Sequence, residues 1–274
     1  MNWLQSLLYG FLAGATEFLP VSSEAHRDLL SLMYGLEVSP LVDLLVHVGV
    51  LAALVLSCIP QLTKFRRERA IFAVPPKQRK RQPDTQTLSN MRILRTAFIP
   101  MLLGFIAWPF THSFTQSLWL SALMLAINGI VLYMTPFVAH GNKDASTTSG
   151  LDGLLMGLGA ALAMLPGISR IAGFTTVGIL RGCERSYALD LVLLLCIPAL
   201  ILLILFDIYF LVVTGIAITG AWVLSAVLAM AIAIPTAYLS IIFLRFLSVK
   251  VGFSGFAYYS WGAAILIFIL YLSI

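Results

Sequence analysis

The chain has 274 residues, of which 60% are hydrophobic and only 11% are charged, and its mean hydropathy is +0.97. A soluble domain carries about a quarter charged residues, so this composition excludes a soluble enzyme, a disordered chain and a disulfide-stapled secreted domain. The apolar runs are apolar on every face, which disfavours an outer-membrane barrel. The composition predicts an all-α polytopic membrane protein, with a single membrane domain over residues 1–274.

The first apolar run, residues 3–19, ends at a proline that two serines soon follow. Pro20 lacks a backbone donor and disfavours helix at the residue before it, so the helix should break there. A second short helix is expected over residues 24–34. A helix, a break and a second helix describe a re-entrant hairpin, whose irregular backbone is tolerated in a membrane only where it is buried in protein or lines a cavity.

The residues around this break suit an anion site. Ser22 or Ser23 is placed to cap the second helix, which directs its positive end and free N–H groups into the break. Ser23 and His26 share one helical face, and a hydroxyl beside an imidazole is the minimum for an activated nucleophile or an acid–base pair. Glu17 lies in an apolar run, where an ionisable group indicates function. Glu24 either complements the helix dipole or belongs to the site.

The next apolar run, residues 41–60, contains two polar side chains with two interpretations each. Asp43 is a helix cap or fold support, or else part of a site. His47, one turn later, either faces a cavity or is a satisfied buried histidine.

A polar connection over residues 61–96 follows, with ten of the 17 basic residues and two acids. By the positive-inside rule this loop faces the cytoplasm, so we expect a multi-pass protein of the cytoplasmic membrane. Contact with anionic lipid headgroups fits that role. No nucleic-acid-binding module or aromatic platform accompanies the charge, so nucleic acid is not an expected partner.

The second half of the chain contains a matching break. The run 151–165 ends at Pro166, and a second short helix is expected over residues 170–182. Arg170 follows the break and supplies a planar guanidinium suited to phosphate oxygens. Asp207, in a long apolar run, lies at an interface or marks a second polar contact. Helices are expected over the remaining apolar runs, 97–110, 118–139, 187–214, 216–244 and 253–273.

Features of the two halves recur in one register. A Leu-Pro-x-x-Ser sequence ends at Ser23 and again at Ser169, and an Asp-Leu pair that opens a long apolar helix recurs at nearly the same offset. Broken segments at corresponding places indicate an inverted-topology repeat with its site at the midplane. We expect repeat 1 over about 1–139 and repeat 2 over about 150–274. If the hairpins meet, their polar groups converge on a site that suits phosphate.

These residues resemble those of a known family, the undecaprenyl-diphosphate phosphatases, also called bacitracin-resistance proteins. The sequence Glu17-Phe-Leu-Pro-Val-Ser-Ser-x-x-His26 is similar to the family's first signature, and Pro166-Gly-x-Ser-Arg170 to its second. The resemblance implies a fold of six transmembrane helices and two re-entrant helix pairs in an inverted-topology repeat. It also implies an integral membrane hydrolase that converts a polyprenyl diphosphate of the undecaprenyl type to the monophosphate plus inorganic phosphate. This reaction recycles the lipid carrier for cell-envelope glycan synthesis. The expected partners are this lipid and the bilayer, and a homodimer is a further expectation.

The resemblance also implies a divalent cation, Mg2+ or Ca2+, and leaves serine or histidine as the nucleophile. The expected catalytic residues are Glu17, Ser23, His26 and Arg170; the expected phosphate-binding residues are Ser22, Ser169 and Arg170; and the expected cation ligands are Glu17 and Glu24.

The chain departs from the family pattern at two places. Ala13 stands where the family usually carries another glutamate, and the loss of one carboxylate weakens cation binding or proton transfer. The residues Ile171-Ala172-Gly173-Phe174 replace a Ser-Gly-x-Thr sequence. The alternative function is therefore a transporter or flippase for polyprenyl phosphate or other anionic phosphates, with weakened or lost hydrolysis. An inverted repeat suits alternating access equally well.

Overall fold

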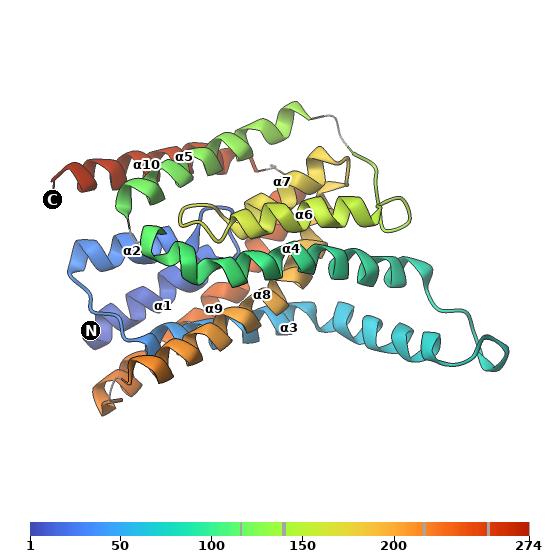
Figure 1. Ribbon diagram of the computed structural model, residues 1–274, viewed down its shortest axis with the longest axis horizontal. Coiled ribbons are helices and arrows are strands. Elements are labelled where there is room, and N and C mark those ends of the chain that lie inside the picture. The colour runs from blue at the N-terminus through green and yellow to red at the C-terminus, as the bar shows by residue number, and fades with distance from the viewer. Residues whose placement is uncertain (116, 139–140, 216–217, 251–252, 274) are drawn as a thin grey trace.

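The computed structural model describes residues 1–115, 117–138, 141–215, 218–250 and 253–273, and these are almost wholly helical (Figure 1). The described α-helices are α1 (Trp3–Glu17), α2 (Ser23–Tyr34), α3 (Pro40–Ala73), α4 (Thr85–Thr115), α5 (Leu118–Met134), α6 (Gly150–Leu162), α7 (Arg170–Leu180), α8 (Arg185–Thr214), α9 (Gly220–Lys250) and α10 (Gly255–Ser273). Residues 139, 216 and 217, at the ends of two expected runs, lie outside the described residues.

Six of these helices are long and apolar enough to cross a membrane, namely α3, α4, α5, α8, α9 and α10. Their outward faces carry large apolar side chains such as Leu103, Ile106 and Leu239, all of which are exposed. Such surfaces are stable beside lipid tails and costly in water. The predicted all-α polytopic membrane fold is therefore confirmed, and the chain is a multi-pass membrane protein.

Both predicted breaks are present. The helix α1 ends at Glu17 and α2 begins at Ser23, while α6 ends at Leu162 and α7 begins at Arg170. In each case the proline of the break lies in a short turn between the two helices. The depth of these hairpins in a bilayer stays a prediction.

The two halves interlock through close helix contacts. The half-helix α1 packs against α9, and the corresponding half-helix α6 packs against α4 (Figure 1). Both contacts use glycines four residues apart, Gly10 with Gly14 and Gly153 with Gly157. A Cβ atom on Gly157 would lie 2.1 Å from the carbonyl oxygen of Ala97, so only glycine allows the backbones to approach this closely. The inversion of one half relative to the other stays a prediction.

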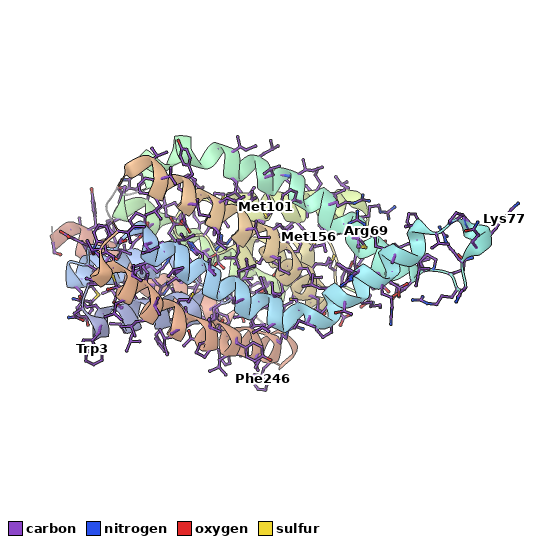
Figure 2. The ribbon with its side chains drawn as sticks, turned by 90° about the horizontal axis from the view of Figure 1, so that it is seen from below. Trp3, Arg69, Lys77, Met101, Met156 and Phe246 are labelled. Atoms are coloured by element: carbon purple, nitrogen blue, oxygen red, sulfur yellow. The ribbon has the colours of Figure 1, made fainter. Side chains whose placement is uncertain are left out.

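Most of the segment 61–96 is helical, so the prediction that it is a polar connecting loop is wrong for most of its length. The helices α3 and α4 continue into it and leave residues 74–84 as the connection, in a hairpin that projects beyond the bundle (Figure 2). Lysine, arginine and glutamine are good helix formers, so a basic composition does not end a helix. Glu68, buried in the hairpin, accepts hydrogen bonds from Arg81 Nη2 at 2.6 Å and from the backbone N–H of Asp84 at 2.9 Å, which fastens the connection.

Candidate active site

The two breaks contact each other directly, which is the condition under which their polar groups converge. The hydroxyl oxygen of Ser22 accepts a hydrogen bond from the backbone N–H of Gly167 at 3.2 Å. In the other direction, the hydroxyl of Ser169 donates to the carbonyl oxygen of Leu19 at 3.2 Å. Each serine thus satisfies a backbone group of the opposite break, where the irregular chain leaves such groups without helical partners.

Asn128 on α5 connects the same two breaks. Its amide nitrogen donates to the carbonyl oxygen of Pro20 at 2.9 Å, and its amide oxygen accepts from the backbone N–H of Ser169 at 3.1 Å. The side chain is fully buried, so these bonds are made where water cannot replace them. Sequence reasoning missed Asn128, although a lone amide inside the apolar run 118–139 was a signal that could have identified it.

The two serines behave differently as caps. Ser169 caps α7 in the expected way, because its hydroxyl oxygen accepts from the backbone N–H of Ala172 at 3.4 Å. Ser22 occupies the cap position of α2 but makes no side-chain cap bond, and its φ of 62° lies in the left-handed region that non-glycine residues rarely adopt. Such strained backbone persists only where surrounding contacts impose it, and it is commonly found at functional sites.

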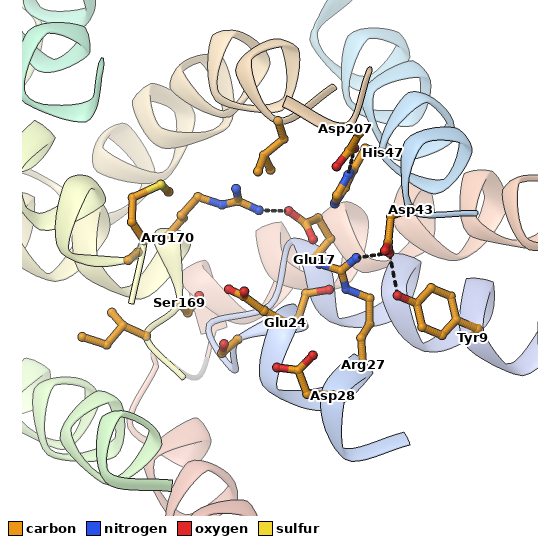
Figure 3. A pocket seen from close by; sticks show the side chains of 16 residues that line it. Tyr9, Glu17, Glu24, Arg27, Asp28, Asp43, His47, Ser169, Arg170 and Asp207 are labelled. Atoms are coloured by element: carbon orange, nitrogen blue, oxygen red, sulfur yellow. Dashed lines mark hydrogen bonds and ion pairs between the residues drawn. The ribbon is translucent and has the colours of Figure 1, made fainter. Parts of the chain in front are cut away.

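An ion pair joins the facing ends of the broken helices. Glu17, the last residue of α1, pairs with Arg170, the first residue of α7 (Figure 3). The Glu17 side chain is only 5% exposed and the Arg170 side chain 19% exposed, so both charges are largely removed from solvent. Arg170 also stands at the positive end of α7, where an anionic group is favoured.

A cavity of about 230 Å³ opens beside this ion pair. Its polar lining comes from both hairpins and from two spanning helices: Tyr9, Glu17, Ser22, Ser23, Glu24, Arg27, Asp28, Asp43, His47, Ser169, Arg170 and Asp207. All the predicted site residues except His26 are therefore brought together here.

The predicted pairing of Ser23 with His26 does not form. The His26 ring is bonded at both nitrogens, with Nδ1 2.7 Å from the carbonyl oxygen of Ser22 and Nε2 2.7 Å from the hydroxyl of Tyr259. The rings of His26 and Tyr259 are stacked, with centroids 5.5 Å apart. A shared helical face fixes only the direction of a side chain, and here α10 supplies the partner. His26 is absent from the described residues that line the cavity, and it supports the break instead.

Two further polar clusters reach the cavity. The Asp43 carboxylate accepts hydrogen bonds from the Tyr9 hydroxyl at 2.6 Å and from Arg27 Nη1 at 2.8 Å, so it is more than a helix cap. His47 Nδ1 lies 2.6 Å from a carboxylate oxygen of Asp207, which decides the interpretation of Asp207 in favour of a second polar contact. Sequence reasoning missed Arg27, which directly follows a motif residue and shares its helix.

The described side chains form no cage that would hold a divalent cation without a bound substrate. Ca2+ takes six to eight oxygen ligands, whereas Mg2+ is usually bound by one or two carboxylates together with waters and substrate phosphates. Among the described residues, no three His, Cys, Asp or Glu side chains are grouped closely enough to bind a metal. Glu17 already pairs with Arg170, and Ala13, one helical turn before it, is 1% exposed in the apolar core. The predicted cation ligands Glu17 and Glu24 both line the cavity. Their binding of a cation stays a prediction.

Comparison with known proteins places the chain in one family. Residues 6–266 match the family model described as bacitracin resistance protein BacA. The undecaprenyl-diphosphatase of Carboxydothermus hydrogenoformans is 32% identical, over 98% of this chain and 98% of the relative. That of Methanobrevibacter smithii is 29% identical over 98% and 97%, and that of Pseudarthrobacter chlorophenolicus is 30% identical over 91% and 90%. The chain belongs to the bacitracin resistance protein BacA family.

Proposed function

We propose that this protein is an integral membrane phosphatase that hydrolyses undecaprenyl diphosphate to undecaprenyl monophosphate and inorganic phosphate. Relatives that align with nearly the whole chain carry the name undecaprenyl-diphosphatase. The observation that carries the proposal is the cavity where the two breaks meet, because it combines a guanidinium, three serine hydroxyls and a helix N-terminus beside apolar, lipid-facing helices. The product is the lipid carrier on which cell-envelope glycans are built, so the reaction recycles that carrier.

We assign the binding of the diphosphate to Arg170, Ser169 and Ser22. Arg170 presents a fork of N–H donors that matches two phosphate oxygens, and the start of α7 adds a positive dipole end. The cavity volume of about 230 Å³ suits a headgroup and not a polyprenyl chain. The headgroup therefore enters the cavity while the chain stays among lipid-facing side chains.

We assign Glu17 and Ser23 to the reacting phosphate. Glu17 orients the Arg170 guanidinium, and Ser23 lines the same cavity. Ser23 lies at the first turn of α2, where its hydroxyl can donate to a phosphate oxygen. Fixed donors and dipoles of this kind stabilise the charge of a transferring phosphoryl group, which is the main contribution that a protein makes to this chemistry. His26 acts by positioning the backbone of Ser22.

The experiment is phosphate release from undecaprenyl diphosphate by the purified protein in lipid nanodiscs. We expect multiple turnovers in the presence of Mg2+ or Ca2+ and almost none in Arg170→Ala. A wild-type rate of phosphate release no higher than that of Arg170→Ala would refute the proposed phosphatase activity. If, in addition, the protein moved polyprenyl phosphate across the bilayer of reconstituted vesicles, the alternative function as a transporter or flippase would replace the phosphatase.

We also propose that the protein lies in the cytoplasmic membrane with the 61–96 hairpin on the inner side. Ten basic residues on that hairpin support this orientation. A cysteine introduced by Lys77→Cys should react with a membrane-impermeant maleimide only after cells are opened, because the reagent cannot reach the inner side of an intact membrane. The native cysteines Cys58, Cys183 and Cys196 are buried and should add little background labelling. The homodimer expected from the sequence stays a prediction.

A further inference from the structure

A histidine and an aspartate from two spanning helices form a pair at the edge of the cavity. His47 comes from α3 and Asp207 from α8, and His47 Nδ1 lies 2.6 Å from Asp207 Oδ2. Both side chains are largely buried, with 6% of His47 and 13% of Asp207 exposed. Figure 3 shows the His47 ring between Asp207 and Glu17, on the cavity side of α3.

The other ring nitrogen of His47 lacks a partner. Its Nε2 is buried and makes no hydrogen bond to any described residue. Burying a ring nitrogen without a partner costs free energy, so such an atom in a cavity lining points to something that binds there. Water and a phosphate oxygen are the groups that a phosphatase cavity brings to such an atom.

The partner at Nδ1 determines what Nε2 can do. A carboxylate accepts only, so Nδ1 carries the proton and Nε2 of the neutral ring presents a lone pair. The same carboxylate stabilises the imidazolium that forms when Nε2 takes up a proton, which is the role of the aspartate in a Ser-His-Asp triad. His47 is thus prepared as a general base, while both nitrogens of His26 are already bonded.

We infer that His47, held by Asp207, is the general base that activates water for attack on the diphosphate. This inference rests on the proposed function. The water oxygen bonds to the terminal phosphorus as the bond from that phosphorus to the bridging oxygen breaks. The electron pair of that bond leaves with the undecaprenyl monophosphate, and the proton of the water passes to His47 Nε2. His47 then returns the proton to solvent, and Asp207 is a positioning residue.

This assignment replaces serine and histidine nucleophiles with water. The Ser23 hydroxyl donates to the carbonyl oxygen of Ala13 at 3.4 Å, and the cavity presents His47 with its second nitrogen open. Other titratable and charged groups line the cavity with His47, and their own ionisation contributes to the pH dependence: Tyr9 and Glu17 from α1, Glu24, Arg27 and Asp28 from α2, Asp43 from α3, Arg170 from α7 and Asp207 from α8.

The test measures phosphate release by His47→Gln, Asp207→Asn and Asp207→Glu, with Asp190→Asn as the matched control. Asp190 lies on the same helix as Asp207 and pairs with Arg245 at 2.9 Å, but it does not line the cavity. We expect kcat to fall about 100-fold in His47→Gln, with KM changed less than about threefold, because a general base contributes to the transition state and not to binding. The kcat of Asp207→Asn should fall by a similar factor, and that of Asp207→Glu should be higher than that of Asp207→Asn.

A pH profile distinguishes a base from a merely structural residue. Wild type and Asp190→Asn should lose rate as the pH falls, because protonation of the base removes its lone pair, and His47→Gln should lose the part of this acidic limb that His47 contributes. An acidic limb in His47→Gln that is unchanged from wild type, or a kcat within about threefold of wild type, would overturn the inference while the proposed function stands. Absence of phosphate release by wild type would instead overturn the proposed function.

A covalent phosphoenzyme intermediate would also overturn the inference that water attacks the diphosphate. Quenching of a single turnover with SDS at mildly alkaline pH, with substrate labelled at the terminal phosphorus, should leave no label on the wild-type protein or on His47→Gln. Label on Ser23 would show that serine and not water attacks. If His47→Gln fails to fold, as judged by its elution from a sizing column, the same pH and quench measurements on Asp207→Asn decide the outcome.

Discussion

The carboxylate of Glu17 is paired with the guanidinium of Arg170, so the last residue of α1 contacts the first residue of α7 although the chain separates them by 153 positions. Neither break holds this pair alone. The pair exists because serine and asparagine side chains bring the two turns together, and a substrate phosphate entering the cavity meets a guanidinium that is already oriented.

Arg170→Lys tests whether the fork of donors matters or only the charge. Lysine keeps the positive charge but offers a single ammonium in place of a planar bidentate donor set. We expect kcat/KM for phosphate release to fall about 100-fold, a loss of roughly 3 kcal/mol in transition-state stabilisation. The matched control is Arg245→Lys, since Arg245 pairs with Asp190 outside the cavity. Equal rates in Arg170→Lys and wild type would show that charge alone suffices.

Removal of divalent cations should leave the folded protein unchanged. The described carboxylates and histidines form no group that could bind a metal, so no cation is expected to be part of the fold. We expect the Tm in detergent to be the same after dialysis against EDTA as in Mg2+ or Ca2+, because a ligand shifts Tm only when it binds the folded state. A rise of several degrees on adding either ion would reveal a resident site that the side-chain positions do not show.

The sequence was sufficient for the breaks and for most of the residues around them. Proline acts locally on the backbone, and an isolated charge in an apolar run has few explanations, so Pro20, Glu17 and Arg170 could each be interpreted alone. Partners contributed by distant helices could not be predicted, because periodicity places a side chain on a face without saying what lies opposite. Tyr259 engages His26 from α10, and Asp207 engages His47 across 160 positions.

Gly157→Ala tests the close contact between α6 and α4. The added Cβ atom would lie 2.1 Å from the carbonyl oxygen of Ala97, so the helices must separate. Overpacking of this kind costs about 1–3 kcal/mol, which should lower the Tm. Gly262→Ala in α10 is the matched control, because no atom of the described residues lies within 4 Å of the Cβ that it adds. Because alanine has a higher helix propensity than glycine, the Tm of Gly262→Ala should be unchanged or slightly raised.

The projecting hairpin should loosen in acid. The Lys64 ammonium, followed by the Thr87 hydroxyl, stabilises the carboxylate and lowers the pKa of Asp84 to about 2. A group with a lowered folded-state pKa contributes stability that is fully present above its unfolded value, about 3.9, and is lost as the pH falls through the folded value.

Hydrogen exchange of the connection 74–84 should therefore be slow at pH 5, where the Asp84 carboxylate is ionised, and should show progressively less protection between about pH 4 and about pH 2. Asp84→Asn removes the titrating group while keeping an oxygen that can accept from Thr87. In that variant the protection should be lower at pH 5 and should no longer depend on pH through Asp84. A wild-type hairpin that keeps full protection down to pH 2 would show that Glu68 and Arg81 alone fasten it.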